Sequence, residues 1–582
     1  MSIFNVFTLF GGLAMFLYGM DVMGKALEKQ AGSRLHSILE KLTSSPLKGF
    51  FLGVIVTAII QSSSATTVMV VGFVNSGFMT LRQAIGVIMG ANVGTTITAW
   101  IISLSGIQGD SFLITLLKPT TFSPILAFIG ILLYMAAKSD KKKNIGVVFL
   151  GFSILMTGME FMSGAVKPLA DVPAFTQLFT LFTNPILGMI VGAILTAVIQ
   201  SSSASVGILQ ALSVTGAVTY GSALPIIMGQ NIGTCVTALL SCFGANKNAR
   251  RTAVVHLYFN ILGSVGFMII FYTLNAVIGF SFIDNSINAA GIALIHTLFN
   301  VTATAILLPL NRVLEKLACL TIRDEENEKE KFQILDDRLI NTPSIAIEQS
   351  KKALRDMANQ ADSSLVKAIA LLDCWNDDDA QQIAVSESQV DKYEDAISTY
   401  LLKISAKNLT AKDGAELTKI LHIVGDLERI GDHALAICKL SEEMHTKNIQ
   451  FSKQANEEIK VLKDAVLEII KITMDAFFKD DTSVAFKVEP LEKVIDELAR
   501  EIKNLHIERL KNNNCTIELG FVLSDLLNNC KRVADHCSNI AIAIIDADID
   551  SFAPHSYVKN LKRESTEGYY ATLENMRSKY KI

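Results

Sequence analysis

The sequence predicts an all-α protein in two parts, a polytopic membrane half followed by a soluble bundle of helices. Three observations predict this class. Long apolar segments fill the first half, and residues 1–310 contain only eight of the 56 Asp and Glu residues. A Gln-Ser-Ser-Ser-Ala motif occurs twice in the first half, 139 residues apart, and a different motif occurs twice in the second half, 103 residues apart. Both halves are therefore expected to contain internal duplications.

The membrane half contains seven apolar segments, which we expect to cross a hydrocarbon layer about 30 Å thick as helices. Lys and Arg cluster after the first, third and last segments and before the sixth, and such clusters favour the cytoplasmic side. This pattern predicts a multi-pass protein of the plasma (inner) membrane with its N-terminus outside. The segments are residues 4–23, 82–104, 122–137, 145–163, 220–243, 250–279 and 285–310.

The duplication in the membrane half keeps one register, without a gap, over more than eighty residues. Composition bias could produce one serine-rich coincidence, but it would not hold a fixed offset. Each copy contains three spans, and an odd number of spans places the two copies in opposite orientations. We therefore expect two inverted repeats. Matched pairs include Gly12 with Gly151, Gly19 with Gly158, Pro46 with Pro185, Gly90 with Gly229, Asn92 with Asn231, and Thr95 with Thr234.

Residues 49–75 and 186–214 each consist of two apolar arms around a short polar run. Each arm has about a dozen residues, so as a helix it reaches about 18 Å and cannot span the membrane alone. We expect two re-entrant helical hairpins whose polar tips lie near the bilayer midplane, surrounded by protein or a water-filled cavity. Inverted repeats with broken helices are typical of secondary transporters.

The two tips have the chemistry of an anion site. The N-terminus of a half-helix presents free backbone N–H groups and the positive end of its dipole. Serine can cap such a helix and can also donate its hydroxyl proton to an oxyanion. Two inverted tips would surround one tetrahedral oxyanion with six hydroxyls. The expected ligands are Ser62, Ser63, Ser64, Ser201, Ser202 and Ser203.

Neither tip contains Lys or Arg, so a phosphate dianion there would need another neutralising partner. Amide and hydroxyl oxygens suit a hard monovalent cation such as sodium and carry protons poorly. Tight helix packing is the alternative explanation for the small residues of Gly90-Ala-Asn-Val-Gly94. The expected sodium ligands are Gln61, Asn92, Thr95, Gln200, Asn231 and Thr234.

The motifs of both halves resemble those of known families. The paired QSSSA tips and paired G-x-N-x-G-T segments resemble the type II sodium/phosphate cotransporter family over residues 1–312. The segments ERIGDHA at 428–434 and KRVADHC at 531–537 resemble the two repeats of a PhoU-type domain. The resemblance implies inorganic phosphate as substrate, co-transported sodium, and a cytoplasmic regulatory domain made of two three-helix bundles.

In the PhoU family, an E-x-x-x-D pattern in each repeat can bind metal clusters. Here Glu428 and Asp432 keep this pattern, whereas Lys531 replaces the acid that would precede Asp535. The resemblance therefore implies a divalent metal site at Glu428, Asp432 and Asp535, with the second copy defective. A solvated helix face is the alternative interpretation.

The predicted function is sodium-coupled phosphate transport by alternating access, within the lipid bilayer and compatible with a homo-oligomer. Transport of another oxyanion or carboxylate, and a membrane-anchored phosphate sensor, remain alternatives, and the direction of transport stays open. The expected domains are residues 1–140 (first transport repeat), 141–318 (second repeat and final span), 319–343 (charged linker), 344–548 (PhoU-like domain) and 549–582 (tail).

Other classes of function are disfavoured. No His or Asp follows the serines at a spacing that would supply a nucleophile's base, so we do not expect an enzyme. The formal net charge of −4 argues against a nucleic-acid partner. Eight scattered cysteines without a CxxC motif indicate neither a disulfide framework nor a zinc site.

Overall fold

The computed structural model confirms the all-α class. It describes residues 3–31, 45–107, 111, 115–116, 118–323, 335–407, 409–512, 515–546 and 566–582, and these residues form helices with one isolated β-bridge between Thr219 and Ser286. The chain divides into two compact units, Met1–Leu339 and Ile340–Ile582.

Among the described residues of the first unit, seven helices are long and apolar enough to cross a membrane, judged by length and composition alone. Each corresponds to one of the seven predicted segments. Two helices that the sequence did not predict, α9 (Pro173–Leu181) and α15 (Asn311–Thr321), accompany them. The seven are α1 (Ile3–Ala31), α5 (Leu81–Ser103), α7 (Pro119–Ala136), α8 (Asp140–Val166), α12 (Tyr220–Ser241), α13 (Lys247–Ile278) and α14 (Ala289–Leu307).

Four shorter helices form the segments predicted as hairpins. They are α3 (Pro46–Ile60), α4 (Ser63–Asn75), α10 (Pro185–Ile199) and α11 (Ser202–Ser213). In both copies a single pair of residues, Gln-Ser, separates the two arms. The first residues of α10, α11 and α12 lie 139 positions after those of α3, α4 and α5. The duplication seen in the sequence therefore extends to the boundaries of the helices.

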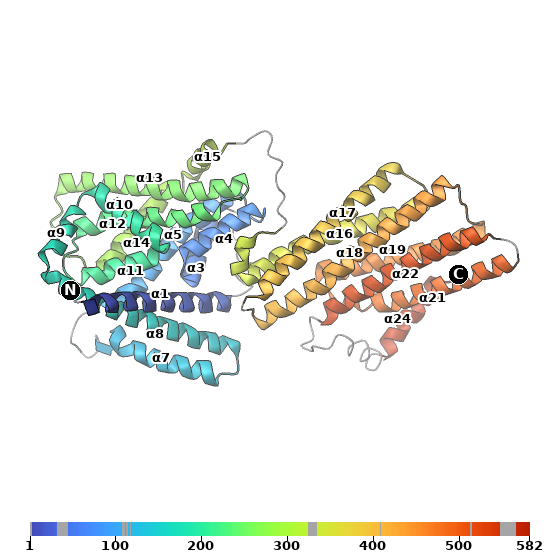
Figure 1. The fold of residues 1–582 in the computed structure, drawn as a ribbon, viewed down its shortest axis with the longest axis horizontal. Coiled ribbons are helices and arrows are strands. Elements are labelled where there is room, and N and C mark those ends of the chain that lie inside the picture. Colours follow the sequence, from blue (N-terminus) through green and yellow to red (C-terminus); the bar gives the residue numbers. More distant parts are fainter. Residues whose placement is uncertain are drawn as a thin grey trace. The chain divides into compact units, whose positions relative to one another are not determined.

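The first helices of the two copies, α1 and α8, pack directly against each other, with α7 on the other side of α8 (Figure 1). Glycines allow the two backbones to touch. A Cβ at Gly12 would lie 2.9 Å from the Gly158 carbonyl oxygen, and one at Gly19 would lie 2.7 Å from that of Gly151. Because the earlier residue of α1 faces the later residue of α8, the two helices run antiparallel.

Close backbone contact at a glycine also joins each hairpin to the helix that follows it. A Cβ at Gly90 would lie 2.0 Å from the carbonyl oxygen of Phe50, so α5 and α3 touch backbone to backbone. A Cβ at the equivalent Gly229 of α12 would lie 2.0 Å from the carbonyl oxygen of Met189 in α10. Only glycine fits at either position, so the short hairpin arms are fixed against a full-length helix.

The second unit contains two sets of three long helices, as the sequence predicts. The third helices of the two sets pack together, and their contacts are reciprocal: His433 Nδ1 lies 2.8 Å from Asn529 Oδ1, and His536 Nδ1 lies 2.8 Å from Asp426 Oδ1. The short α20 (Thr482–Ala485) and the terminal α24 (Thr566–Lys579) complete the unit. Residues 547–565, which are the end of the expected PhoU-like domain and the first part of the expected tail, lie outside the described residues. The sets are α16 (Pro343–Leu371), α17 (Asp377–Ser405) and α18 (Ala411–Thr446), then α19 (Lys453–Lys479), α21 (Val488–Lys511) and α22 (Ile517–Asp546).

We expect Gly90→Ala to destabilise the membrane unit, because the new Cβ would collide with a carbonyl oxygen that belongs to the backbone. Overpacking of this kind costs about 1–3 kcal/mol or more. Thermal unfolding of the purified protein in detergent would measure it. Gly266→Ala on α13 is the matched control, since a Cβ there meets nothing within 4 Å. Equal stability of the two variants would contradict the prediction.

Candidate functional site

The two predicted tips have the same backbone geometry. Gln61 ends α3 in the left-handed region (φ 60°, ψ 22°), and Gln200 ends α10 in the same way (φ 59°, ψ 22°). A residue with a side chain adopts this conformation at a cost of about 1–3 kcal/mol, which the surrounding fold must offset. The sharp reversal allows a second helix to begin two residues after the Gln in each copy.

The first serine of each triplet caps that second helix. The Ser62 hydroxyl accepts a hydrogen bond of 3.2 Å from the Ala65 N–H, and the Ser201 hydroxyl accepts one of 3.2 Å from the Ala204 N–H. Each capping hydroxyl keeps its own proton as a donor. The first N–H groups of a helix have no partner within it, so each tip presents backbone donors next to hydroxyl donors.

The remaining serines of the two triplets lie just inside the second arms. The side chains of Ser63, Ser202 and Ser203 are buried at 5–6 % exposure, and Ser64 is partly buried. Burial makes hydrogen bonds to a charged ligand stronger than they would be in water. The six serines thus provide one cluster of hydroxyl groups at each tip.

The asparagines and threonines expected to bind sodium use their protons within their own helices. The Asn92 amide donates to the Ile88 carbonyl at 3.1 Å, and the Asn231 amide donates to the Ile227 carbonyl at 2.9 Å. Thr95 and Thr234 likewise donate to the carbonyl one turn earlier, at 2.9 and 3.0 Å. Among the described residues nothing donates to the side-chain oxygens of these four residues. These side-chain oxygens therefore remain available as acceptors, which suits a cation.

The two hairpins differ in their side-chain contacts. In the first, the Thr57 hydroxyl bonds to that of Thr66 at 3.1 Å and joins the two arms. The equivalent hydroxyls of Thr196 and Ser205 are buried and have no hydrogen-bond partner among the described residues. The first hairpin is thus closed by a bond that the second lacks.

The glutamines of the two tips show the same difference. Gln61 is only 5 % exposed, its side-chain oxygen accepts a bond of 3.0 Å from Thr98 on α5, and its side-chain amide donates to the Ala58 carbonyl. Gln200 is exposed. The Gln61 oxygen is therefore engaged by protein, whereas Gln200 is accessible. The sequence did not point to Thr98, because its partner lies 37 residues away and no motif contains both.

Each hairpin also contacts the other copy. The second arms α4 and α11 pack against α12 and α5 respectively, in addition to the long helix of their own copy. In one of these contacts the Gln210 side-chain amide of α11 donates to the Ala99 carbonyl of α5 at 3.1 Å. Each second arm thus packs against the long helix of both copies, and these two long helices, α5 and α12, carry the Asn and Thr acceptors.

In the second unit, the structure groups Asp432 with two acids that the sequence analysis missed. Ligand oxygens of Glu387, Asp391 and Asp432 all lie within 4.8 Å of one another. Glu387 and Asp391 themselves form an E-x-x-x-D pattern on α17, which was the available signal. Glu428 lies one turn before Asp432 on α18. Burial and the nearby carboxylates Asp432 and Asp391 raise the pKa of Glu428. Exposed acids gather in proteins without a metal too, so the cluster alone identifies none.

The second copy has a different balance of charge. Glu492 and Asp496 repeat the E-x-x-x-D pattern on α21, and they line a surface depression together with Lys531 and Asp535. The Lys531 ammonium lies 2.6 Å from the Asp496 carboxylate. The substitution noticed in the sequence therefore supplies an ion pair at the position where the first copy has only acids.

Seven long apolar helices and two donor-rich tips between short helices are the features of a membrane transport protein. Comparison with known proteins agrees. The family model described as Na+/Pi-cotransporter matches residues 15–164 and 154–295, and the PhoU-domain model matches residues 354–441 and 459–544. The chain belongs to the Na+/Pi-cotransporter family and carries a PhoU-like domain.

Relatives cover both halves. "Putative inorganic phosphate export protein YjbB" of Salmonella typhimurium is 24% identical over 549 residues, which are 92% of this chain and 97% of that protein. Human "Sodium-dependent phosphate transport protein 2B" is 40% identical over 98 residues, 16% of this chain and 14% of that protein. The crystal structure of PhoU from Pseudomonas aeruginosa has 22% identity and a TM-score of 0.34, covering 36% of this chain and all of that chain.

The pKa of Glu492 gives a test of the acidic depression. Burial, followed by the neighbours Glu489, Asp535 and Asp496, raises this pKa from 4.5 to about 7. Between these values the folded state binds more protons than the unfolded state, so the stabilising contribution of the protonated group is lost as pH rises through this window. Glu492→Gln should therefore become more stable than the natural protein as pH rises from about 4.5 to 7.

The expected gain at pH 8 is on the order of 1–2 kcal/mol, reduced from the full pKa shift because the side chain is partly exposed. Urea unfolding of residues 340–582 at several pH values would measure it. Glu457→Gln, which removes an exposed carboxylate, is the control. A stability difference between Glu492→Gln and the natural sequence that does not vary with pH would be inconsistent with a raised pKa.

Proposed function

We propose that this protein couples the movement of sodium to the transport of inorganic phosphate by alternating access, and that its C-terminal helical domain regulates this transport. The observation that carries the proposal is the pair of tips with the same backbone conformation, each with a left-handed Gln and a capping Ser, whose second arms pack against the helices that carry the Asn and Thr acceptors. Family membership supports phosphate as the substrate class.

The substrate would be held by serines and the cation by amides and threonines. Phosphate would accept hydrogen bonds from Ser62–Ser64 and Ser201–Ser203 and from the free N–H groups of the two half-helices. Sodium would bind to oxygens of Gln61, Asn92, Thr95, Gln200, Asn231 and Thr234. Because the tips contain no basic side chain, sodium would supply the positive charge that a dianion needs. Human protein 2B is named as sodium-dependent, which supports the same coupling.

Re-entrant hairpins in inverted repeats are part of this proposal. The antiparallel contact of α1 with α8 supports inversion, since equivalent helices of two inverted copies must run in opposite directions. The difference between the hairpins supports alternating access: Gln61 is buried and bonded, whereas Gln200 is exposed. If the first tip became exposed while the second became buried, the site would open first to one side of the membrane and then to the other.

The proposed topology places the N-terminus outside and the PhoU-like domain in the cytoplasm, in agreement with the distribution of Lys and Arg. The proposed domains are residues 1–140, 141–318, 319–343, 344–548 and 549–582. A divalent metal would bind at Glu428 and Asp432 in the first copy, with Glu387 and Asp391 as further ligands beside Asp432, and Asp535 would belong to the defective site of the second copy. Direction is set by gradients and regulation, and the name of YjbB favours export.

Labelled phosphate flux into proteoliposomes tests the proposal. We expect uptake with an inward sodium gradient and little uptake when sodium is replaced by potassium. A pH gradient without sodium should not substitute, since the cation ligands do not titrate. Inhibition by unlabelled phosphate but not by sulfate or a dicarboxylate would exclude the alternative substrates. Uptake that does not depend on sodium would refute sodium coupling. Binding of phosphate without any flux would refute transport.

Removal of one tip hydroxyl should weaken phosphate binding. Each lost hydrogen bond to a charged ligand is worth about 1.5–3 kcal/mol, so Ser63→Ala and Ser202→Ala should each raise the half-saturating phosphate concentration about 10- to 150-fold. Ser213→Ala, at the far end of α11, is the control, because its hydroxyl bonds to the Gln210 carbonyl of its own helix. An unchanged phosphate dependence in both tip variants would place the site elsewhere.

A further inference from the structure

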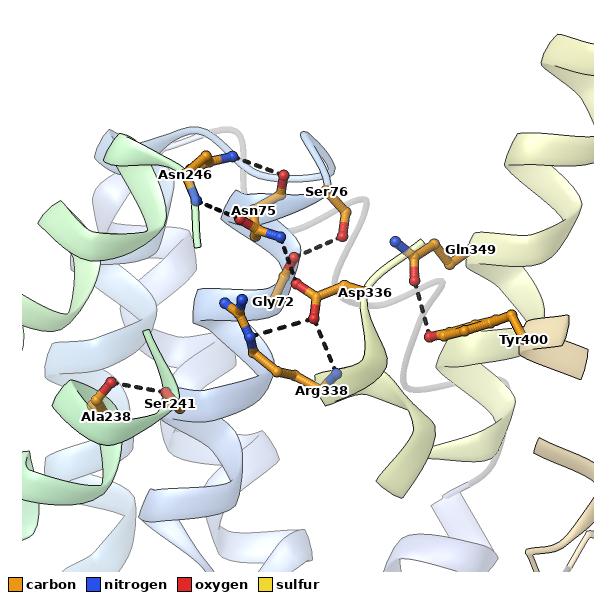
Figure 2. A network of polar contacts seen from close by, with 10 residues as sticks. All are labelled: Gly72, Asn75, Ser76, Ala238, Ser241, Asn246, Asp336, Arg338, Gln349 and Tyr400. Atoms are coloured by element: carbon orange, nitrogen blue, oxygen red, sulfur yellow. Dashed lines mark hydrogen bonds and ion pairs between the residues drawn. The ribbon is translucent and has the colours of Figure 1, made fainter. Parts of the chain in front are cut away.

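A short segment just before the PhoU-like helices is fixed to the first hairpin (Figure 2). It comprises Leu335–Leu339, within the expected linker, and α16 begins at Pro343. The segment follows residues 324–334, which lie outside the described residues, yet it is itself well enclosed. Leu335, Asp336 and Leu339 are 7, 2 and 1 % exposed. Because charged and apolar side chains both lie inside, the segment has a defined binding place on the membrane unit.

The polar half of this contact is centred on the Asp336 carboxylate. One of its oxygens accepts a bond of 2.8 Å from the Asn75 side-chain amide at the end of α4. The other oxygen accepts the Arg338 N–H at 3.0 Å, and the Arg338 guanidinium lies 3.4 Å from it. A buried carboxylate is costly unless such partners are present, so this contact is specific in its geometry.

Asn75 connects this carboxylate to a third part of the membrane unit. Its side-chain oxygen accepts the Asn246 N–H at 2.8 Å, and its carbonyl accepts the Asn246 side-chain amide at 2.8 Å. Asn246 caps α13, after the turn that follows α12. The end of α4, this turn and the segment 335–339 are therefore joined through one side chain (Figure 2).

The apolar half of the contact depends on a glycine of α4. Leu339 lies so close to Gly72 that a Cβ there would be 2.8 Å from its Cδ2. At the equivalent positions of the second copy, 139 residues later, Ala211 replaces Gly72 and Val214 replaces Asn75. The second hairpin thus lacks both the space and the amide, and the segment can dock in this way on the first hairpin alone.

The geometry points to Leu335–Leu339 as an autoinhibitory strap that restrains the first hairpin. This inference rests on the proposed alternating access, in which a hairpin must shift against its surroundings. The strap ties the end of α4 to the α12–α13 turn and is continuous with the C-terminal domain. Such a shift must break the Asp336–Asn75 contact or carry the strap with it, so the docked strap slows transport.

The test compares Asp336→Ala with Asp337→Ala in the full chain. Each variant removes one carboxylate. The Asp336 carboxylate is buried and accepts the bond from Asn75, whereas the Asp337 side chain is exposed. Two measurements are made on the purified protein: hydrogen exchange of the backbone amides at the end of α4, residues 74–79, and sodium-driven phosphate flux in proteoliposomes. The expected result for Asp336→Ala is at least about tenfold faster exchange and a several-fold higher flux, with Asp337→Ala like the natural sequence.

A second variant shows whether the effects of Asp336→Ala come from the lost contact or from misfolding. Asn75→Val copies the residue of the second hairpin and should give the same two changes, and combining it with Asp336→Ala should add little, because both remove one contact. Unchanged exchange in both single variants would show that the strap does not hold α4. Faster exchange with unchanged or lower flux would show that it does not inhibit. If the natural protein carries no phosphate at all, the proposed function fails, whereas the exchange data still decide whether the strap is docked.

Discussion

The close contact of helix backbones at glycines is the constraint on which the membrane unit depends. In a bilayer, apolar side chains gain little by leaving lipid for protein, so helix association relies on close packing. Gly12 and Gly19 bring α1 against α8, and Gly90 and Gly229 bring each hairpin against a full-length helix. The same glycines belong to the matched pairs that reveal the duplication in the sequence. The glycines that recur in both copies are thus the ones that hold the helices together, because two short, strained hairpins need rigid neighbours.

That rigidity supports the conformation of the tips. A left-handed glutamine is costly, and a helix that starts inside a protein leaves unpaired donors. Both features occur together, twice, at Gln61-Ser62 and Gln200-Ser201. A fold that only had to pack helices could avoid both costs with continuous spans. The costs become useful when a ligand accepts the donors, because backbone and hydroxyl donors that are already oriented need no rearrangement on binding.

Much of this could be predicted from the sequence, because apolar length, fixed offsets and capping residues are local signals. The seven spans, the all-α class and the two sets of three helices were predictable for this reason. The bond from Thr98 to Gln61 and the grouping of Glu387 with Asp432 were not, since they depend on which helix faces which. The difference between the hairpins was equally hidden: Thr57 and Thr196 are the same residue at equivalent positions, and only tertiary structure decides that one is bonded.

The places where the copies differ are as informative as those where they agree. The backbone of the tips, the residues of the acceptors and the glycine contacts are equivalent in both membrane copies, whereas Gly72 and Asn75 are replaced by Ala211 and Val214. In the second unit, Lys531 forms an ion pair with Asp496 where the first copy clusters acids. A symmetric pair of hairpins has no built-in preference for one side. A strap that can dock on one of them supplies that preference, and it does so in the segment that leads directly into the C-terminal domain.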